Sequence, residues 1–189
     1  MAIKRLGNVP GGTGLPSQTG NSGKILVTDG TTASWSNPAV TLIGTIAGSG
    51  TISFTSIPQT YRHLRIHISF DMATQTTVYL NVNNSAMSFN YGHLRYSSTS
   101  AIVGVQGSSN SSPEFGYYAG SSTTGSTMDI LIPGYSNSNP KGISVVSAGF
   151  GNLNGFAGHG FSSSSTSSIS SISISSGINR YEASLYGWY

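Results

Sequence analysis

The chain has 189 residues, of which 79 are serine, threonine or glycine and only 13 are charged, which excludes a highly charged disordered chain. Serine, threonine and glycine are poor helix formers, so the composition also argues against a helical protein. The net charge of +3 reflects few acids rather than clustered bases, so the sequence does not indicate binding to a nucleic acid. The lack of cysteine excludes disulfides and thiolate metal sites.

Residues 1–38 are rich in glycine, proline, asparagine, serine and threonine, and they cannot bury enough apolar surface to fold alone. We therefore predict an extended N-terminal arm, whose apolar anchors are Ile25, Leu26, Val27 and Trp35. Asp29-Gly30 is a turn pair directly after the apolar run. Lys4 and Arg5 are not followed by an apolar stretch, so we expect neither a signal peptide nor a membrane segment.

Residues 39–189 change to short apolar alternations separated by turn residues, which predicts one further domain, the knob. The clearest strand is 62–70, where Leu64, Ile66, Ile68 and Phe70 alternate with polar residues. We expect a hairpin around Gly48-Ser49-Gly50. The predicted strands are Val40–Ala47, Thr51–Ile57, Arg62–Phe70, Thr76–Val82, Met87–Tyr96, Ala101–Val105, Ser126–Ile132, Gly142–Phe150, Ser167–Ile174 and Arg180–Trp188.

This pattern predicts an all-β fold, with an antiparallel β-sandwich or jelly-roll knob preceded by the extended arm. Two stretches are less clear. Residues 162–176 are serine or threonine except for Ile169, Ile172 and Ile174; a disordered linker is one interpretation, but these β-branched residues favour a strand near the C-terminal half. Residues 104–125 predict a long surface loop at one end of the knob.

The side chains that most often perform chemistry do not form a recognisable constellation. His63 and His67 share one strand face but stand about 13 Å apart at the usual rise, too far to bind one zinc ion, and His93 and His159 resemble loop residues. The five acids are well separated, so a glycosidase pair is not indicated, although the sequence leaves it open. We expect no enzyme activity, no metal and no cofactor.

Several tyrosines fall in or near predicted loops beside serine, asparagine and glycine, a composition suited to polar recognition. Tyr117, Tyr118 and Tyr135 are the candidates for contact with a glycan or a protein partner. The alternative is ordinary packing in turns and subunit interfaces.

The segment Thr19-Gly-Asn-Ser-Gly-Lys-Ile-Leu-Val-Thr-Asp-Gly-Thr-Thr-Ala-Ser-Trp35 resembles a segment common in tail-fibre and virion appendage proteins of tailed bacteriophages. Tyr61-Arg-His-Leu-Arg-Ile66 and the ending Ser184-Leu-Tyr-Gly-Trp-Tyr189 are similar to a second set of phage proteins. The resemblance implies a virion structural protein, a homotrimer with an attachment arm and a C-terminal knob.

Two readings of that resemblance follow. In the first, the chain is a capsid decoration (cement) protein made in the host cytoplasm, and its arm docks on the major capsid protein or other virion proteins at the particle exterior. In the second, it is a tail-fibre or receptor-binding protein that recognises host surface polysaccharide. A polysaccharide depolymerase would need a carboxylate pair and usually a repetitive β-helix, neither of which the sequence suggests.

Overall fold

The computed structural model describes residues 15–72, 76–83, 89–97, 101–109, 114–118, 125–149, 156–163, 165–175 and 177–189. Over these residues the protein consists of β strands joined in antiparallel sheets, without a helix. It divides into two compact units, residues 1–40 with Tyr189 and residues 41–188. The predicted domain boundary, after residue 38, lies two residues from that division.

The arm contains a small two-stranded sheet. Strand β1 (Ile25–Thr28) pairs with β2 (Ala33–Ser36), and Asp29 and Gly30 lie in the turn between them. Residues 25–36 are therefore a hairpin, which differs from the extended backbone predicted for the arm. Gly30 has φ of +93°, a conformation that side chains other than glycine rarely adopt.

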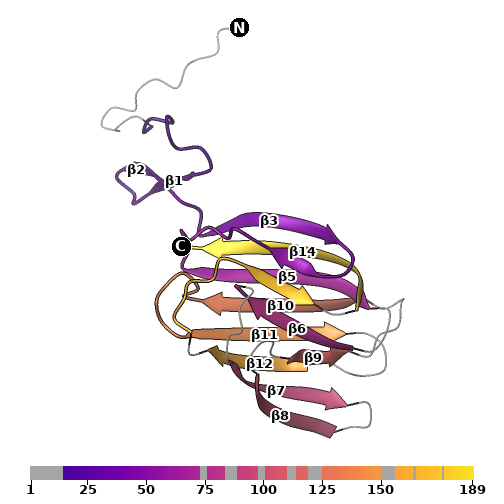
Figure 1. Ribbon diagram of the computed structural model, residues 1–189. Coiled ribbons are helices and arrows are strands. Elements are labelled where there is room, and N and C mark those ends of the chain that lie inside the picture. The colour runs from indigo at the N-terminus through magenta and orange to yellow at the C-terminus, as the bar shows by residue number, and fades with distance from the viewer. Residues whose placement is uncertain are drawn as a thin grey trace. The chain divides into compact units, whose positions relative to one another are not determined.

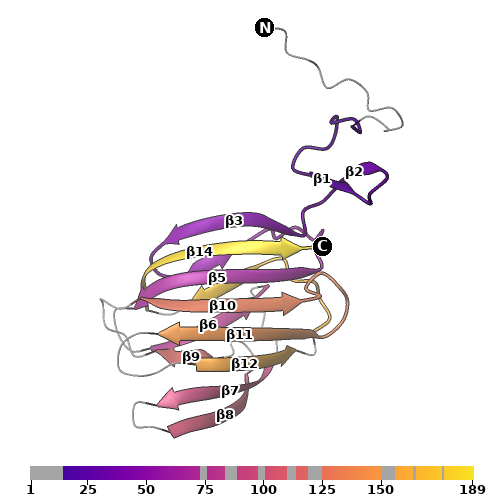
Figure 2. The same ribbon diagram turned by 180° about the vertical axis from the view of Figure 1, so that it is seen from behind.

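The knob contains a sheet of eight strands and a sheet of four (Figures 1 and 2). The large sheet has the order β3-β14-β5-β10-β11-β12-β7-β8. Its strands are β3 (Val40–Gly48), β14 (Ile178–Trp188), β5 (His63–Met72), β10 (Ser126–Pro133), β11 (Lys141–Gly149), β12 (Phe156–Ser163), β7 (Phe89–Ser97) and β8 (Ala101–Ser109).

The small sheet has the order β4-β13-β6-β9 and lies on one side of the large sheet, in front of it in Figure 1 and behind it in Figure 2. Its strands are β4 (Ile52–Phe54), β13 (Ile172–Ser175), β6 (Thr76–Val82) and β9 (Glu114–Tyr118). The chain passes between the two sheets repeatedly, because consecutive strands β3, β4, β5 and β6 alternate between them.

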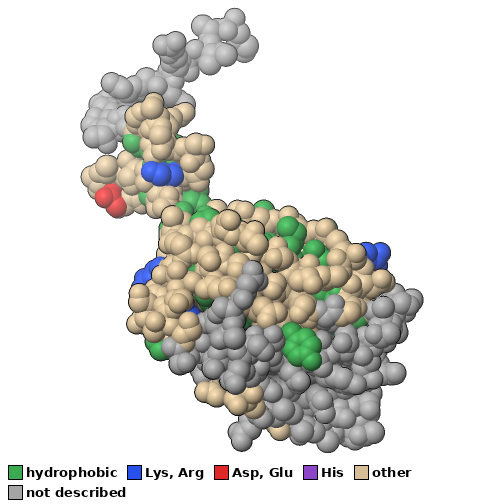
Figure 3. Space-filling view, viewed as in Figure 1, with side chains coloured by type: hydrophobic (Ala, Val, Ile, Leu, Met, Phe, Trp, Pro, Cys, Tyr) green, Lys and Arg blue, Asp and Glu red, His purple; other side chains and the backbone are tan. Residues whose placement is uncertain are grey.

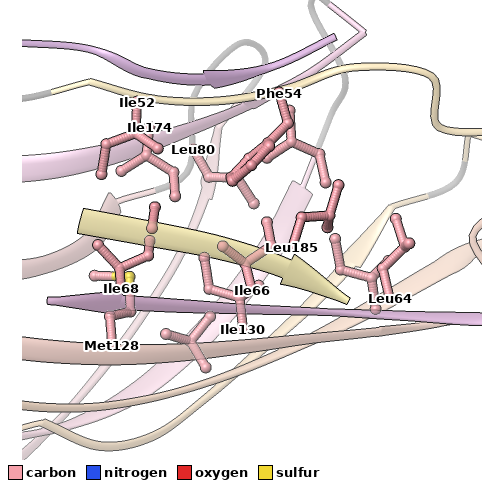
Figure 4. Packing of buried hydrophobic residues seen from close by; sticks show 14 of the residues in the cluster. Ile52, Phe54, Leu64, Ile66, Ile68, Leu80, Met128, Ile130, Ile174 and Leu185 are labelled. Carbon is pink, nitrogen blue, oxygen red and sulfur yellow. The ribbon is translucent and has the colours of Figure 1, made fainter. Parts of the chain in front are cut away.

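Both sheets contribute to a single hydrophobic core (Figure 4). Leu64, Ile66 and Ile68 of β5 are buried, as the alternation predicted, and Arg65 and His67 between them face outward. From the small sheet come Ile52, Phe54, Val78, Leu80, Val82, Ile172 and Ile174.

Several predicted elements are wrong. Residues 48–50 do not close a hairpin, since β3 and β4 belong to different sheets. The predicted loop 104–125 contains the end of β8 and all of β9, and His93 and His159 lie on β7 and β12 as register partners rather than in loops. Glycine and serine are frequent in these strands, so the alternation of apolar and polar side chains that indicates a strand is not visible in their sequence. Residues 87–88 and 150 of two predicted strands lie outside the described residues.

Candidate functional site

The arm hairpin brings the predicted anchor residues together. Leu26 is the cross-strand partner of Trp35, so the two side chains share one face, while Ile25 and Val27 lie on the other. The indole Nε1 of Trp35 donates a hydrogen bond to the carbonyl oxygen of Pro16 (3.2 Å), which ties the preceding segment to the hairpin.

Polar side chains fix the hairpin turn. The Asp29 carboxylate oxygen Oδ1 accepts hydrogen bonds from the amides of Thr31 (2.8 Å) and Thr32 (2.7 Å). Hydrogen bonds from these two amides lower the pKa of the Asp29 carboxyl group. The Thr32 amide has the larger effect and the Thr31 amide the smaller one. An aspartate side chain that binds the backbone two residues on is a known turn former, so the sequence pair Asp29-Gly30 specifies this turn locally.

The apolar side chains of the hairpin are open to solvent. Ile25, Leu26 and Val27 are 48%, 43% and 36% exposed. A two-stranded hairpin is marginally stable in water by itself, and the exposed aliphatic side chains of Ile25 and Val27, which share one face of it, are suited to burial against another surface. The arrangement therefore offers a preformed, apolar docking element.

Of the three candidate tyrosines, the structure describes the side chain of Tyr135 alone. Tyr135 is fully buried, and its hydroxyl donates a hydrogen bond to the carbonyl oxygen of Pro58. Its predicted contact with a glycan or partner is wrong, because the ring belongs to the core. Burial also raises the pKa of the Tyr135 hydroxyl. Tyr117 and Tyr118 lie on β9, where their backbone pairs with Thr77 and Thr76, but their side chains lie outside what the structure describes.

A charged cluster lies on the outer face of the large sheet, the face turned away from the small sheet. Arg65 Nε donates to Asp129 Oδ1 (2.6 Å), and His67 Nδ1 lies 3.3 Å from Asp129 Oδ2. Partial burial raises the pKa of Asp129, but hydrogen bonds and charge from Arg65 and His67 outweigh it and hold this pKa below its usual range. His63, on the same face, accepts a hydrogen bond from the Gly134 amide at Nδ1.

Replacing Asp129 with asparagine is expected to make the knob less sensitive to acid. A lowered carboxyl pKa stabilises the fold above the unfolded pKa, near 3.9, and this contribution is lost as the pH falls through the folded value. Because the side chains are 36–49% exposed, the effect is below about 1 kcal/mol. Thermal unfolding from pH 7 to pH 3 measures it; a difference between wild type and Asp129→Asn that stays constant with pH would contradict the assignment.

A cleft of about 550 Å³ with a mixed polar and apolar lining lies where β3 and β5 end and β14 begins. Arg180 holds the Asp71 carboxylate through Nε (3.0 Å) and Nη2 (2.6 Å), and Ser69, Tyr181 and Glu182 also line it. Sequence reasoning missed this cleft, because Asp71 and Arg180 are 109 residues apart and only strand pairing joins them. Its charged and hydroxyl groups are suited to hydrogen bonding with a polar ligand.

The two knob motifs, far apart in the sequence, lie side by side in the fold. β5 and β14 pair so that Leu64 is opposite Gly187, and the Arg62 amide donates to the Trp188 carbonyl oxygen (2.6 Å). The Tyr61 ring lies against Gly187, where a Cβ atom would come within 2.4 Å of it. The motifs at residues 61–66 and 184–189 thus belong to one structural unit, the paired strands β5 and β14 with the preceding Tyr61.

Comparison with known proteins gives no family: no family model matches the chain, and a search of curated proteins finds no relative. Within the described residues, no group of three or more histidine, cysteine, aspartate or glutamate side chains is placed to hold a metal ion. The same part of the chain has no helix with the length and apolarity needed to cross a membrane.

Proposed function

We propose that this chain is a structural protein of a tailed bacteriophage virion, a homotrimeric capsid decoration protein whose arm docks on neighbouring virion proteins. The observation that carries the proposal is the arm hairpin, which exposes Ile25 and Val27 on one face and Leu26 on the other. These residues lie inside the segment that resembles phage appendage proteins. The knob is then the part displayed at the particle exterior.

The strand order supports a jelly-roll knob. Eight of the strands form two groups of four, β3-β14-β5-β10 and β4-β13-β6-β9. The antiparallel pairs β4/β13, β5/β10 and β6/β9, with β3 beside β14, are the nested pairs of a double Greek key. The hairpin β7–β8 and the strands β11–β12 extend one sheet. Jelly rolls of this order are common among viral capsid proteins and lectins.

The hairpin also explains how an arm with few apolar residues could attach. Covering the exposed parts of Ile25 and Val27 contributes about 1.5–2 kcal/mol, from the usual value for burying aliphatic side chains. Several arms on one trimer would bind the same particle together, so that modest single contacts add up to stable attachment.

Threonine at positions 25 and 27 is expected to weaken attachment roughly 10- to 30-fold for a single arm, because it keeps the strand preference while removing apolar surface. The measurement is co-sedimentation of the purified Ile25→Thr/Val27→Thr chain with particles that lack the protein. Leu131→Thr is the matched control, because Leu131 is also an exposed aliphatic residue on a strand, at 43%, but lies in the knob. Equal binding by wild type and the double variant would contradict the proposal.

The second candidate is a tail-fibre or receptor-binding protein for host polysaccharide. The observation that favours it is the cleft beside Asp71 and Arg180, because hydroxyl-rich ligands need hydrogen-bonding groups such as those in its lining. Immunogold labelling of intact particles separates the two functions. Label on the head supports decoration, whereas label confined to the tail contradicts it and favours the receptor-binding function.

A further inference from the structure

The two sheets of the knob have edge strands that adjoin. β3 is the first strand of the large sheet, β4 is the first strand of the small one, and only residues 49–51 separate them. Figures 1 and 2 both show β3 at the margin of the large sheet. We call the surface made by these two strands the β3–β4 edge.

Within the described residues, the β3 part of this edge has none of the usual protections against pairing with another strand. Natural proteins usually guard exposed edge strands with charged residues, proline or a covering segment. The nine residues of β3 include neither a charge nor a proline, and the chain has no charged residue between Asp29 and Arg62. Among the described residues, no strand pairs with the outer side of β3.

Apolar side chains are exposed along the same strand. Val40 is 44% exposed and Leu42 is 54% exposed. In the view of Figure 3, green hydrophobic side chains lie among tan ones over this part of the knob. An uncovered strand of this length and composition pairs readily with another chain.

A glycine in the middle of β3 is a second, independent observation. Gly44 does not have a positive φ, and a Cβ atom there would meet no atom of the described residues within 4 Å, apart from its neighbours in the chain. Neither the backbone conformation nor packing against the described residues therefore requires glycine, although glycine weakens a strand. A glycine within a strand often marks a close approach by another backbone.

We propose that the β3–β4 edge is the surface through which copies of this chain associate, an inference that rests on the proposed self-assembly. The open main-chain donors and acceptors of β3 are best satisfied by another strand. An uncharged edge meets a second copy without like-charge repulsion, whereas a nucleic acid would require lysine and arginine, which this edge lacks.

The test compares a lysine introduced on the β3–β4 edge with a lysine introduced at an exposed position away from that edge. Gly44→Lys has room to fold and puts an ammonium group into the contact, so it is expected to raise the dissociation constant of the oligomer by about tenfold or more. Val146→Lys is the matched control, because Val146 is 58% exposed but lies on β11, inside the large sheet. Analytical ultracentrifugation measures both, and Leu42→Lys repeats the test if Gly44→Lys does not fold.

Hydrogen exchange of the unmodified full chain gives a measurement that needs no variant. Amides of β3 should exchange more slowly as rising concentration populates the oligomer. The proposal is overturned if β3 exchange is unchanged while the oligomer forms, or if the edge variants associate as tightly as Val146→Lys. A wild-type chain that remains monomeric overturns the trimer as well, whereas an oligomer that tolerates both edge lysines overturns this contact alone.

Discussion

Replacing Gly187 with alanine is expected to destabilise the knob by about 2–3 kcal/mol, as inserting a methyl group into a filled space usually does. A Cβ atom at position 187 would lie 2.4 Å from Cγ of Tyr61 and 2.6 Å from its Cδ1 and Cδ2. Gly187 is buried near the end of β14, opposite Leu64, and β14 lies between β3 and β5 in the large sheet. The strand therefore cannot retreat from the ring without disturbing the core.

Moving the Tyr61 ring away from position 187 would also cost free energy. The clashing atoms are at the end of the ring nearest the backbone, so relief requires a change of χ1 rather than a small tilt. The backbone beside it is fixed, because the Arg62 amide donates to the Trp188 carbonyl oxygen and Ser136 Oγ donates to the Tyr61 carbonyl oxygen (3.0 Å). This explains why a glycine lies within the Leu-Tyr-Gly ending.

A double-mutant cycle measures the contact. Urea unfolding of wild type, Gly187→Ala, Tyr61→Ala and the double variant gives the free energy of each. Once Tyr61 is alanine, the ring is absent and the Gly187 substitution should cost less than about 1 kcal/mol. The same loss of stability in both backgrounds would show that the Tyr61 ring does not set the need for glycine.

Local patterns predicted the centre of the knob well. Strand Thr76–Val82 was predicted with the bounds it has, and Val78, Leu80 and Val82 are buried as expected. The alternation of apolar and polar residues determines which side chains can face a core, so the all-β antiparallel fold followed from it. The same alternation says nothing of which strands pair, because pairing depends on residues distant in the sequence.

The role of Tyr135 shows this limit. Its neighbours are glycine, serine and asparagine, which locally indicate a loop, and residues 134–140 do connect β10 to β11. Yet its ring is buried and its hydroxyl reaches Pro58, which lies 77 residues away. Lys141 shows the same limit, because a lysine is expected at the surface but this one is almost fully buried. Its ammonium group donates hydrogen bonds to the carbonyl and side-chain oxygens of Asn137 and to the Asn139 carbonyl oxygen, and these bonds make its burial possible.

The sequence predicted which arm residues are apolar and where the chain turns, but it did not predict that the arm forms a hairpin. The apolar residues Ile25, Leu26 and Val27 and the turn pair at Asp29 were visible in the sequence. The pairing of β1 with β2 was missed because β2, Ala33–Ser36, holds a single large apolar residue and shows no clear alternation. The candidate contact therefore came from composition, and its geometry came from the structure.

In the serine-rich stretch 162–176 the isoleucines favoured a strand near the C-terminal half, with a disordered linker as the alternative. The structure has a strand at Ile172–Ser175, shorter than the predicted 167–174, and an irregular segment before it. Ile169 anchors that segment in the core, and its amide donates to the Tyr135 carbonyl oxygen (2.9 Å). Hydrogen bonds from distant residues, rather than local preference, determine this conformation.

Asn83 makes the largest share of those hydrogen bonds, so Asn83→Ala is expected to destabilise the knob by about 2–3 kcal/mol. The side-chain oxygen Oδ1 accepts from the amides of Ser170 (2.7 Å) and Ser171 (3.2 Å), and Nδ2 donates to the Ser168 carbonyl oxygen (2.7 Å). Asn83 also has φ of +57°, which asparagine tolerates better than alanine does. Alanine therefore loses the hydrogen bonds and strains the backbone.

Two further substitutions at position 83 separate these causes. Asn83→Gly accepts the positive φ but loses every side-chain hydrogen bond, and Asn83→Asp keeps an acceptor for the two amides but loses the donor to Ser168. Stability in urea should fall in the order wild type, aspartate, glycine, alanine, and cleavage by protease near residues 165–171 should accelerate in the same order. Glycine as stable as asparagine would mean that the segment holds its conformation without the Asn83 amide.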